Sequence, residues 1–270
     1  MKLKSILKSQ LNAYLNRRGQ TITYITSQKR LKDVISRFYP YSVGLDLVRL
    51  GGDADGGYLV PDDLAGLTAC FSPGVSDVAD FELALAENYG VVCHLADASV
   101  EGPPVHHKNI YFEKKFLGPL TEGETIRLTD WVNEKAGNND NDLLLQMDIE
   151  GAEYGVLIDT PLELLSRFRI IVVELHAVHE LFSEPKVKLL EDILGKLTRF
   201  HTVVHSHPNN CCGTMTQSGV TIPRVLELTL LRNDRFTSAK PAHAFPHMLD
   251  RPNVNHNPDL VLPDDWYMTA

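Results

Sequence analysis

The stretch "DLLLQMDIEGAEYGVL", residues 142–157, gives the clearest indication of the fold, because an apolar run ends there in a group of carboxylates. Residues 143–147 have the length and composition of a buried strand, and Asp148 follows at once. Gly151 allows a tight turn from this strand into a helix. Since an apolar strand without clean alternation is typical of a parallel sheet covered on both faces, the stretch predicts an α/β domain.

Similar apolar runs, each followed by an amphipathic stretch, occupy most of the chain on both sides of this segment. Their alternation predicts a largely parallel sheet with helices on both faces. Ser76 and Thr129 are assigned as N-caps of the helices that follow them. The predicted strands are 67–74, 91–97, 142–148, 168–175, 201–207 and 225–232, with short strands within 109–116 and 124–128, and the predicted helices are 28–38, 76–90, 129–137, 184–200 and a short one ending near residue 159.

Composition divides the chain into three parts. Residues 1–40 are predicted to form a helical extension, residues 41–236 the α/β domain, and residues 237–270, rich in Pro, Asn and His, an extended arm laid over the domain. The preferred interpretation of residues 1–18 is a helix that packs on its own domain or on a second subunit of a homo-oligomer. The alternative is peripheral contact with an anionic membrane. On this helix Leu3, Ile6, Leu7, Leu11, Tyr14 and Leu15 share one face, and Lys2, Lys4, Lys8, Arg17 and Arg18 lie elsewhere.

Charge and cysteine content narrow the class of protein. A net charge of −9 over 270 residues argues against nucleic acid as a partner, because phosphate binding needs a field of Lys and Arg. Cys70 and Cys93 lie in apolar runs and are expected to be small core residues. Four thiols without a secretory signal are typical of a cytoplasmic protein. No apolar run approaches the ~20 residues of a membrane-spanning helix.

Ligands of open parallel sheets bind outside the carboxyl ends of the strands, so the residues just after each strand are the candidates for a site. Gly74 lets the backbone approach a ligand, and the N–H groups at the helix start near Ser76 favour an anion. Asp97 comes 23 residues after Gly74, near the spacing at which an acidic residue meets the ribose of a nucleotide-type ligand. Ser99 is assigned to the same binding site.

Asp148 ends the next strand, and Glu174 and His176 end the one after it, so the three are expected to meet at the same edge of the sheet. A carboxylate at the tip of a buried strand costs desolvation energy unless it has a partner or a function. Capping of the following helix is the alternative for Asp148 and Glu150. Glu153 is assigned only as a helix-start charge.

These segments resemble a known family. "LLLQMDIEGAE" is similar to the K-x-D-x-E-G-x-E signature of FkbM-type methyltransferases, and "FSPGVSDVADFE" is similar to the first cofactor loop of that family. "RLGGDADGGYLV", "VVELH" and "HSHPNN…IPRVLELTLLR" resemble segments of one branch, so that the likeness covers residues 47–232. The cofactor loop here has one Gly and a Pro where the family more often has two Gly, and Gln146 replaces a frequent Lys.

The resemblance implies the seven-stranded, Rossmann-like class I methyltransferase fold, S-adenosylmethionine as cofactor, and O-methylation of a sugar, a glycan or another small hydroxylated acceptor. Carried over by position, Gly74 would line the cofactor, Asp97 would hold its ribose, and Asp148 would lie at the mouth of the active site. The resemblance supplies no catalytic base. Two other interpretations stay open, namely a non-catalytic binding or scaffold protein with this fold and a nucleotide-dependent oxidoreductase.

Methyl transfer to a hydroxyl needs a group that accepts a proton, and histidine is the side chain best matched to neutral pH. His176 is the first candidate, since Glu174 could orient its ring; His207 is the second, with Asn209 and Asn210 as donors to a polar substrate. His179 and His205 are further candidates. A metal-assisted alternative would place Mg²⁺ or Mn²⁺ on Asp148, Glu174 and His176, and "HSHPNNCC", residues 205–212, is a weaker candidate for Zn²⁺.

Overall fold

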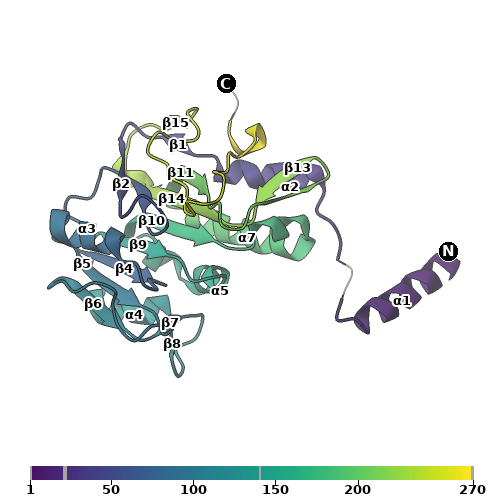
Figure 1. The fold of residues 1–270 in the computed structure, drawn as a ribbon, viewed down its shortest axis with the longest axis horizontal. Coiled ribbons are helices and arrows are strands. Elements are labelled where there is room, and N and C mark those ends of the chain that lie inside the picture. The colour runs from purple at the N-terminus through teal and green to yellow at the C-terminus, as the bar shows by residue number, and fades with distance from the viewer. Residues whose placement is uncertain (1, 21–22, 140, 269–270) are drawn as a thin grey trace.

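A computed structural model describes residues 2–20, 23–139 and 141–268, with side chains from Ser9 onward. Its main element is a seven-stranded sheet in the order β11-β14-β10-β9-β4-β5-β6 (Figure 1). Only β14 runs antiparallel to its neighbours. The order reverses between β4 and β9, which is where a parallel sheet opens a crevice for ligands. The strands are β4 (Ala69–Pro73), β5 (Val92–Ala96), β6 (Ile110–Glu113), β9 (Leu143–Met147), β10 (Phe168–Leu175), β11 (His201–Pro208) and β14 (Leu226–Arg232).

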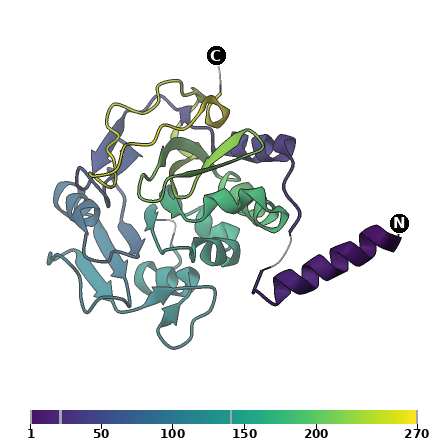
Figure 2. The same ribbon diagram turned by 45° about the vertical axis from the view of Figure 1, so that its right-hand side comes forward.

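Helices cover both faces of this sheet, as Figures 1 and 2 show. The predicted seven-stranded, mostly parallel fold is therefore confirmed. The helices are α1 (Lys2–Asn16), α2 (Gln28–Ile35), α3 (Asp80–Tyr89), α4 (Leu128–Ala136), α5 (Glu153–Asp159), α6 (Leu162–Leu165) and α7 (Glu184–Leu197), and 3-10 turns cover Ser36–Phe38, Val178–Phe182 (η2), Asn233–Arg235 and Asp264–Trp266 (η4).

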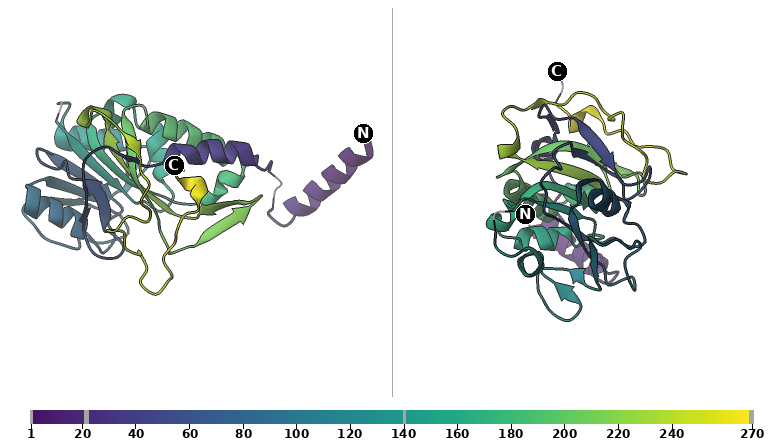
Figure 3. Two further views of the ribbon diagram at one scale, coloured as in Figure 1. Left: turned by 90° about the horizontal axis from the view of Figure 1, so that it is seen from above. Right: turned by 90° about the vertical axis from the view of Figure 1, so that its left-hand side faces the viewer.

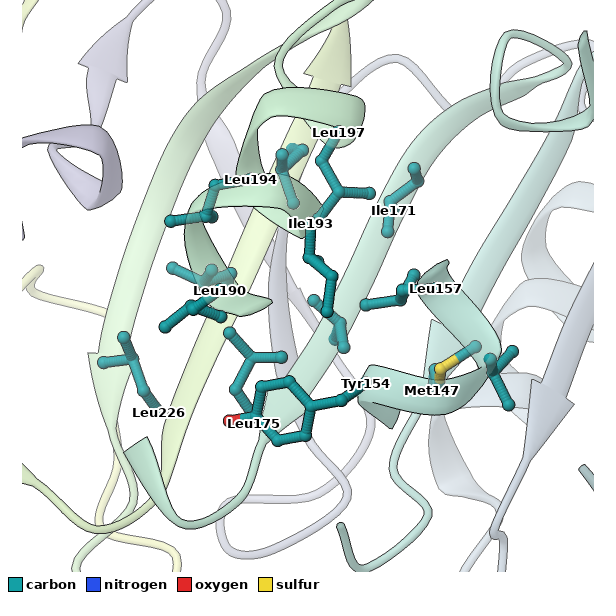
Figure 4. Packing of buried hydrophobic residues seen from close by; sticks show 14 of the residues in the cluster. Met147, Tyr154, Leu157, Ile171, Leu175, Leu190, Ile193, Leu194, Leu197 and Leu226 are labelled. Atoms are coloured by element: carbon teal, nitrogen blue, oxygen red, sulfur yellow. The ribbon is translucent and has the colours of Figure 1, made fainter. Parts of the chain in front are cut away.

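Alternation along the strands divides the core into two apolar layers. Leu145 and Ile171 point to the layer that α2, α4, α5 and α7 cover. Leu144 and Ile170 point to the other layer, which α3 and a hairpin of β2 (Leu47–Leu50) and β3 (Tyr58–Pro61) cover. Figure 4 shows the first layer, in which Leu190, Ile193, Leu194 and Leu197 of α7 pack with Leu157 of α5 and with Ile171 and Leu175 of β10.

The C-terminal segment runs over one end of the sheet as a largely irregular chain (Figure 3). Its strand β15 (Lys240–Pro241) pairs with β1 (Tyr41–Ser42). Trp266 in η4 is buried against Phe38, with 5.6 Å between the ring centroids. The remaining pairs are β7 (Phe116–Leu117) with β8 (Thr125–Ile126), and β12 (Thr214–Gln217) with β13 (Val220–Pro223).

The N-terminal helix α1 projects away from the rest of the described chain in Figures 1 and 2 and in the left panel of Figure 3. Residues 1–18 were expected to pack on their own domain or on a second subunit. The described part of α1 does not pack on the domain (Figures 1 and 2), and packing on a second subunit stays a prediction. Leu11 and Tyr14 are 51% and 53% exposed. Met1 and the side chains at positions 2–8, on which the predicted amphipathic face also relies, lie outside the description.

Two predicted helix starts are wrong. The helix α3 begins at Asp80, with Ala79 as N-cap, so Ser76 does not cap it. The helix α4 begins at Leu128, which places Thr129 inside its first turn. At Ser76 the chain makes an extra turn before α3, and at Thr129 the helix α4 has already started, so in both places the polar residue only resembles a cap.

Among the helices of the described residues, none is long and apolar enough to cross a membrane.

Candidate active site

A cavity of about 520 Å³ opens at the carboxyl ends of β4, β5 and β9. Its lining includes all five residues that the sequence assigns to ligand binding. Because they follow three neighbouring parallel strands, turns distant in sequence converge on one crevice. These five residues are Gly74, Ser76, Asp97, Ser99 and Asp148.

Gly74 is required by a close approach of two strand ends. Its φ is +87°, and a Cβ atom there would lie 1.5 Å from the carbonyl oxygen of Asp148. Its N–H donates to the carbonyl of Ala96 at 2.9 Å. The glycine therefore holds the ends of β4, β5 and β9 together, and it shapes the cavity through the protein backbone.

Asp97 organises the turns on both sides of itself and is only 6% exposed. One carboxylate oxygen accepts the N–H of Ser76 at 2.9 Å. The other accepts the N–H and the hydroxyl of Ser99 at 2.8 and 2.6 Å. A carboxylate has about four acceptor sites, so roughly one remains for a ligand hydroxyl.

His176 lies among four carboxylates beside the cavity wall that Asp148 forms. Its Nε2 is 3.8 Å from Asp148, 3.3 Å from Glu150 and 3.5 Å from Glu174. Burial acts to lower the pKa of His176, but the hydrogen bond to Glu153 and the surrounding negative charge outweigh burial and raise it. Burial also raises the pKa of Asp148 to about 7, and one oxygen of Asp148 has no hydrogen-bond partner.

Glu153 orients the ring of His176, contrary to its assignment as only a helix-start charge. It stands first in α5 and is fully buried. One of its oxygens accepts the N–H groups of Ile149 and Gly151 at 3.1 and 3.0 Å and lies 2.9 Å from Nδ1 of His176. Glu174, which was predicted to orient this ring, lies 3.5 Å from the opposite ring nitrogen, Nε2, so orientation by Glu174 stays a prediction beside that by Glu153. As predicted, Gly151 makes the turn into the helix, with φ at +103°.

Polar residues also form a row beneath the cavity, and most of them escaped sequence reasoning. On the sheet face that β2 and β3 cover, Ser72, Gln146 and Glu174 follow the last apolar residues of β4, β9 and β10. The hydroxyl of Ser72 contacts the buried carboxyl of Glu82 and the amide oxygen of Gln146. Burial raises the pKa of Glu82 to about 7. The sequence signal for this row was a polar residue two positions after an apolar one on the same face of a strand, in "CFS", "LLQ" and "VVE".

The row continues across β14 and β11, where Glu174, Glu227 and His207 are consecutive register partners. His207 is buried, with Nδ1 3.4 Å from Glu227 and no partner for Nε2. The amide of Asn209 donates to Glu174 at 3.2 Å. The amide of Asn210 donates to backbone carbonyls of the C-terminal segment, so it is not free for a substrate as predicted.

No histidine candidate is among the residues that line the cavity, and His179 and His205 have partners elsewhere. His179 contacts Arg224 at 3.0 Å, and Nε2 of His205 is 2.9 Å from Asp250. Only one group of side chains in the described residues has metal-ligand geometry, and it consists of Asp148, Glu174 and His176, with ligand atoms within 4.8 Å of one another. The predicted Zn²⁺ set in residues 205–212 does not form.

Sequence reasoning also missed or undervalued residues around the cavity mouth. Asp55, Gly56 and Tyr58 also line the cavity, and they come from β3 and the loop before it. Arg49, by contrast, donates to the carbonyls of Gly52 and Ala54 and holds the hairpin turn.

Comparison with known protein families finds a match for part of the chain. Residues 86–201 match the family described as the methyltransferase FkbM domain. The match includes Asp97, Asp148, Glu174 and His176, and it is narrower than the resemblance over residues 47–232. No curated protein matches the chain.

Solved structures with detectable likeness include two variants of the 16S rRNA (adenine(1408)-N(1))-methyltransferase from Catenulisporales acidiphilia. Each is 12% identical with a TM-score of 0.30. The tryptophan-to-alanine variant aligns over 73% of this chain and 99% of its own, and the aspartate-to-alanine variant over 68% and 98%.

Proposed function

We propose that this S-adenosylmethionine-dependent methyltransferase, whose residues 86–201 match the FkbM domain, methylates a hydroxyl group of a sugar or glycan. One observation carries the proposal: His176 lies among carboxylates directly behind Asp148, which lines the cavity. A hydroxyl acceptor needs a proton acceptor at such a place, whereas a scaffold protein does not.

The cavity residues fit the cofactor in charge and in hydrogen bonding. The cofactor is cationic, and Asp55, Asp77, Asp97 and Asp148 line the cavity. Asp97 would accept a ribose hydroxyl at its remaining acceptor site, with Ser76 and Ser99 holding its carboxylate in place. A volume of about 520 Å³ lies within the ordinary range for sites of this kind.

The residues of the chain then divide the work of the reaction. When bound, the cofactor supplies a methyl group on a sulfonium, so that an oxygen–carbon bond forms as the sulfur–carbon bond breaks. His176 takes the hydroxyl proton on Nε2, while Glu153 holds Nδ1. Asp148 and Glu174 favour the imidazolium that results, because both lie within 4 Å of Nε2. His207, the register partner of Glu227 on the neighbouring strand β11, is the second candidate for the base.

The same carboxylates support a polyhydroxylated acceptor without phosphate groups. Asp148 lines the cavity, so its carboxyl group can accept from an acceptor hydroxyl. Asp55 and Glu150 add negative charge at the cavity lining, which opposes a phosphate. That nucleic acid is not the acceptor stays a prediction.

A metal-assisted form of the same site is the second candidate. The three clustered ligands Asp148, Glu174 and His176 suit Mg²⁺ or Mn²⁺, which would bind neighbouring sugar hydroxyls and lower the pKa of one of them. Dialysis against a chelator separates the two forms. Unchanged turnover supports His176 as the base without metal, and loss of turnover restored by Mg²⁺ or Mn²⁺ supports the metal.

The direct test is a methyl-transfer screen. The full chain is incubated with labelled S-adenosylmethionine and a panel of monosaccharides, glycans, amines and RNA. We expect label in a sugar or glycan as an O-methyl group, identified by NMR of the product. Labelling of amines or RNA, with none in the sugars and glycans, would overturn the proposal.

A further inference from the structure

Basic residues are concentrated at the N-terminus of a chain that is acidic overall. Residues 1–32 hold eight of the 26 Lys and Arg residues and none of the 35 Asp and Glu residues, the first of which is Asp33. The rest of the chain therefore holds 18 basic and 35 acidic residues. Such a division predicts two parts with opposite electrostatic preferences.

Within this basic segment, α2 and α1 differ. In α2, Arg30 pairs with Glu184 and Glu191, and Lys32 pairs with Asp265 at 2.8 Å, so these charges serve the domain. The helix α1 instead stands clear of the domain (Figure 3). Three basic residues lie in α1 and two follow it directly, namely Lys2, Lys4, Lys8, Arg17 and Arg18.

Apolar side chains are also exposed in and after α1. Leu11 and Tyr14 are more than half exposed, and Tyr24 and Ile25 are 75% and 61% exposed. In the sequence, the apolar positions of α1 recur at helical spacing on one face. A helix with an apolar face and surrounding Lys and Arg suits the interface of an anionic membrane, where both kinds of group find a partner.

We propose that α1 binds the surface of an anionic phospholipid membrane and tethers the methyltransferase domain to it. The segment 24–26 is fixed to the domain, since Thr26 donates to the carbonyl of Phe182 and Glu184 donates to that of Tyr24. Residues 17–23 connect it to α1 and can span at most about 25 Å. That reach exceeds the Debye length of about 8 Å, so the acidic domain can remain beyond the repulsion of the lipid headgroups.

A second copy of the chain suits α1 less well. Its acidic surface would attract the basic residues. The large exposed apolar residues of the domain, however, come from separate elements, such as Tyr89 of α3, Phe116 of β7 and Met215 of β12. The membrane alone offers an apolar layer beneath a layer of negative charge.

Co-sedimentation of the full chain with vesicles tests the proposal. We expect binding to vesicles with about 30 mol% phosphatidylserine, little binding to pure phosphatidylcholine, and loss of binding at about 0.5 M salt. Each Lys near an anionic surface strengthens binding roughly fivefold, so Lys4→Glu/Lys8→Glu should weaken it at least about 25-fold. The matched control Lys108→Glu/Lys188→Glu makes the same change in net charge on exposed residues of the domain and should bind like the wild type.

A second pair of variants tests the apolar face. Leu11→Gln/Leu15→Gln should weaken binding at least about tenfold, since each apolar side chain that enters the interface contributes about 1 kcal/mol or more. Ser9→Gln/Asn12→Gln, on the polar face, should not weaken it. No binding to anionic vesicles, or equal loss in both control pairs, would overturn the proposal. So would a concentration-dependent dimer that Lys4→Glu/Lys8→Glu abolishes, because α1 would then bind a second copy.

Discussion

Replacing Glu153 by Gln should damage the active site while leaving the fold intact. The amide oxygen of Gln can still accept from the N–H groups of Ile149 and Gly151, so the turn before α5 keeps its hydrogen bonds. The change removes the negative charge beside Nδ1 of His176, which lies 2.9 Å away. In the alternative amide orientation, which gives up the bonds to Ile149 and Gly151, Gln would present a donor to Nδ1 and favour the wrong ring tautomer.

The size of the effect follows from the kind of hydrogen bond that is lost. A bond to a charged partner contributes about 1.5–3 kcal/mol and a neutral one about 0.5–1.5 kcal/mol, so the imidazolium loses about 1–2 kcal/mol of support. The turnover number should therefore fall about 5- to 30-fold, and further if the tautomer changes. Binding of S-adenosylhomocysteine should change less than about twofold, because Glu153 is not among the residues that line the cavity.

Two measurements decide this prediction. Nitrogen-15 NMR of the His176 ring, which needs no acceptor, should report a proton on Nδ1 in the neutral wild-type ring and a mixture in Glu153→Gln. Turnover is then measured with the acceptor that the methyl-transfer screen identifies. Glu150→Gln is the matched control, since Glu150 is 3.3 Å from Nε2 but its side chain is 87% exposed. Wild-type turnover and an unchanged ring tautomer in Glu153→Gln would refute the role of Glu153.

Three further predictions concern stability. Gly74→Ala should destabilise the fold by about 3 kcal/mol or more, because its Cβ would meet the Asp148 carbonyl at positive φ, whereas Gly102→Ala, with nothing within 4 Å, should be neutral in urea unfolding. Glu82→Gln should stabilise the protein above pH 7 by up to about 3 kcal/mol. The pKa of Glu82 is about 7 in the folded state and lower in the unfolded state, so the wild type loses stability as pH rises from the unfolded to the folded value. A pH-independent difference in thermal unfolding between the variant and the wild type would contradict this prediction. Asp142→Asn should cost about 3 kcal/mol at pH 7, since it leaves buried Arg169 short of a partner. Burial acts to raise the pKa of Asp142, but Arg169 and Arg232 outweigh it and lower the pKa, so the contribution is present above about pH 4 and disappears as pH falls through the folded pKa; an equal loss at pH 7 and at pH 2 would refute this reading.

Periodicity was sufficient to predict the sheet. The strands β9 and β10 have five and eight residues, all buried, so their composition alone marks them as interior. Helix starts were harder to predict, because Ser76 and Thr129 look like caps in sequence but only backbone geometry decides where the first helical hydrogen bond forms.

The site was predictable where it depends on strand ends and not where it depends on side-chain direction. Asp97 and Asp148 follow strands, so topology alone carries them to one cavity. Glu153 could not be assigned in the same way, because its carboxylate turns back across the first turn of α5 to reach His176. Asp55 comes from the hairpin loop that lies over the sheet, and Glu227 comes from β14, the antiparallel strand within it. No local sequence pattern reveals where either residue lies relative to the cavity.

Calorimetric titration of the full chain with S-adenosylhomocysteine shows whether the cavity beside Asp97 is the cofactor site. We predict one site with a dissociation constant in the micromolar range, and binding at least about tenfold weaker in Asp97→Ala, which loses a charged acceptor for ribose. Part of that loss would come from the turn residues Ser76 and Ser99, so the unfolding temperature of Asp97→Ala is measured alongside. No heat of binding to the wild type at high micromolar ligand, or equal affinity in a folded Asp97→Ala variant, would contradict the claim.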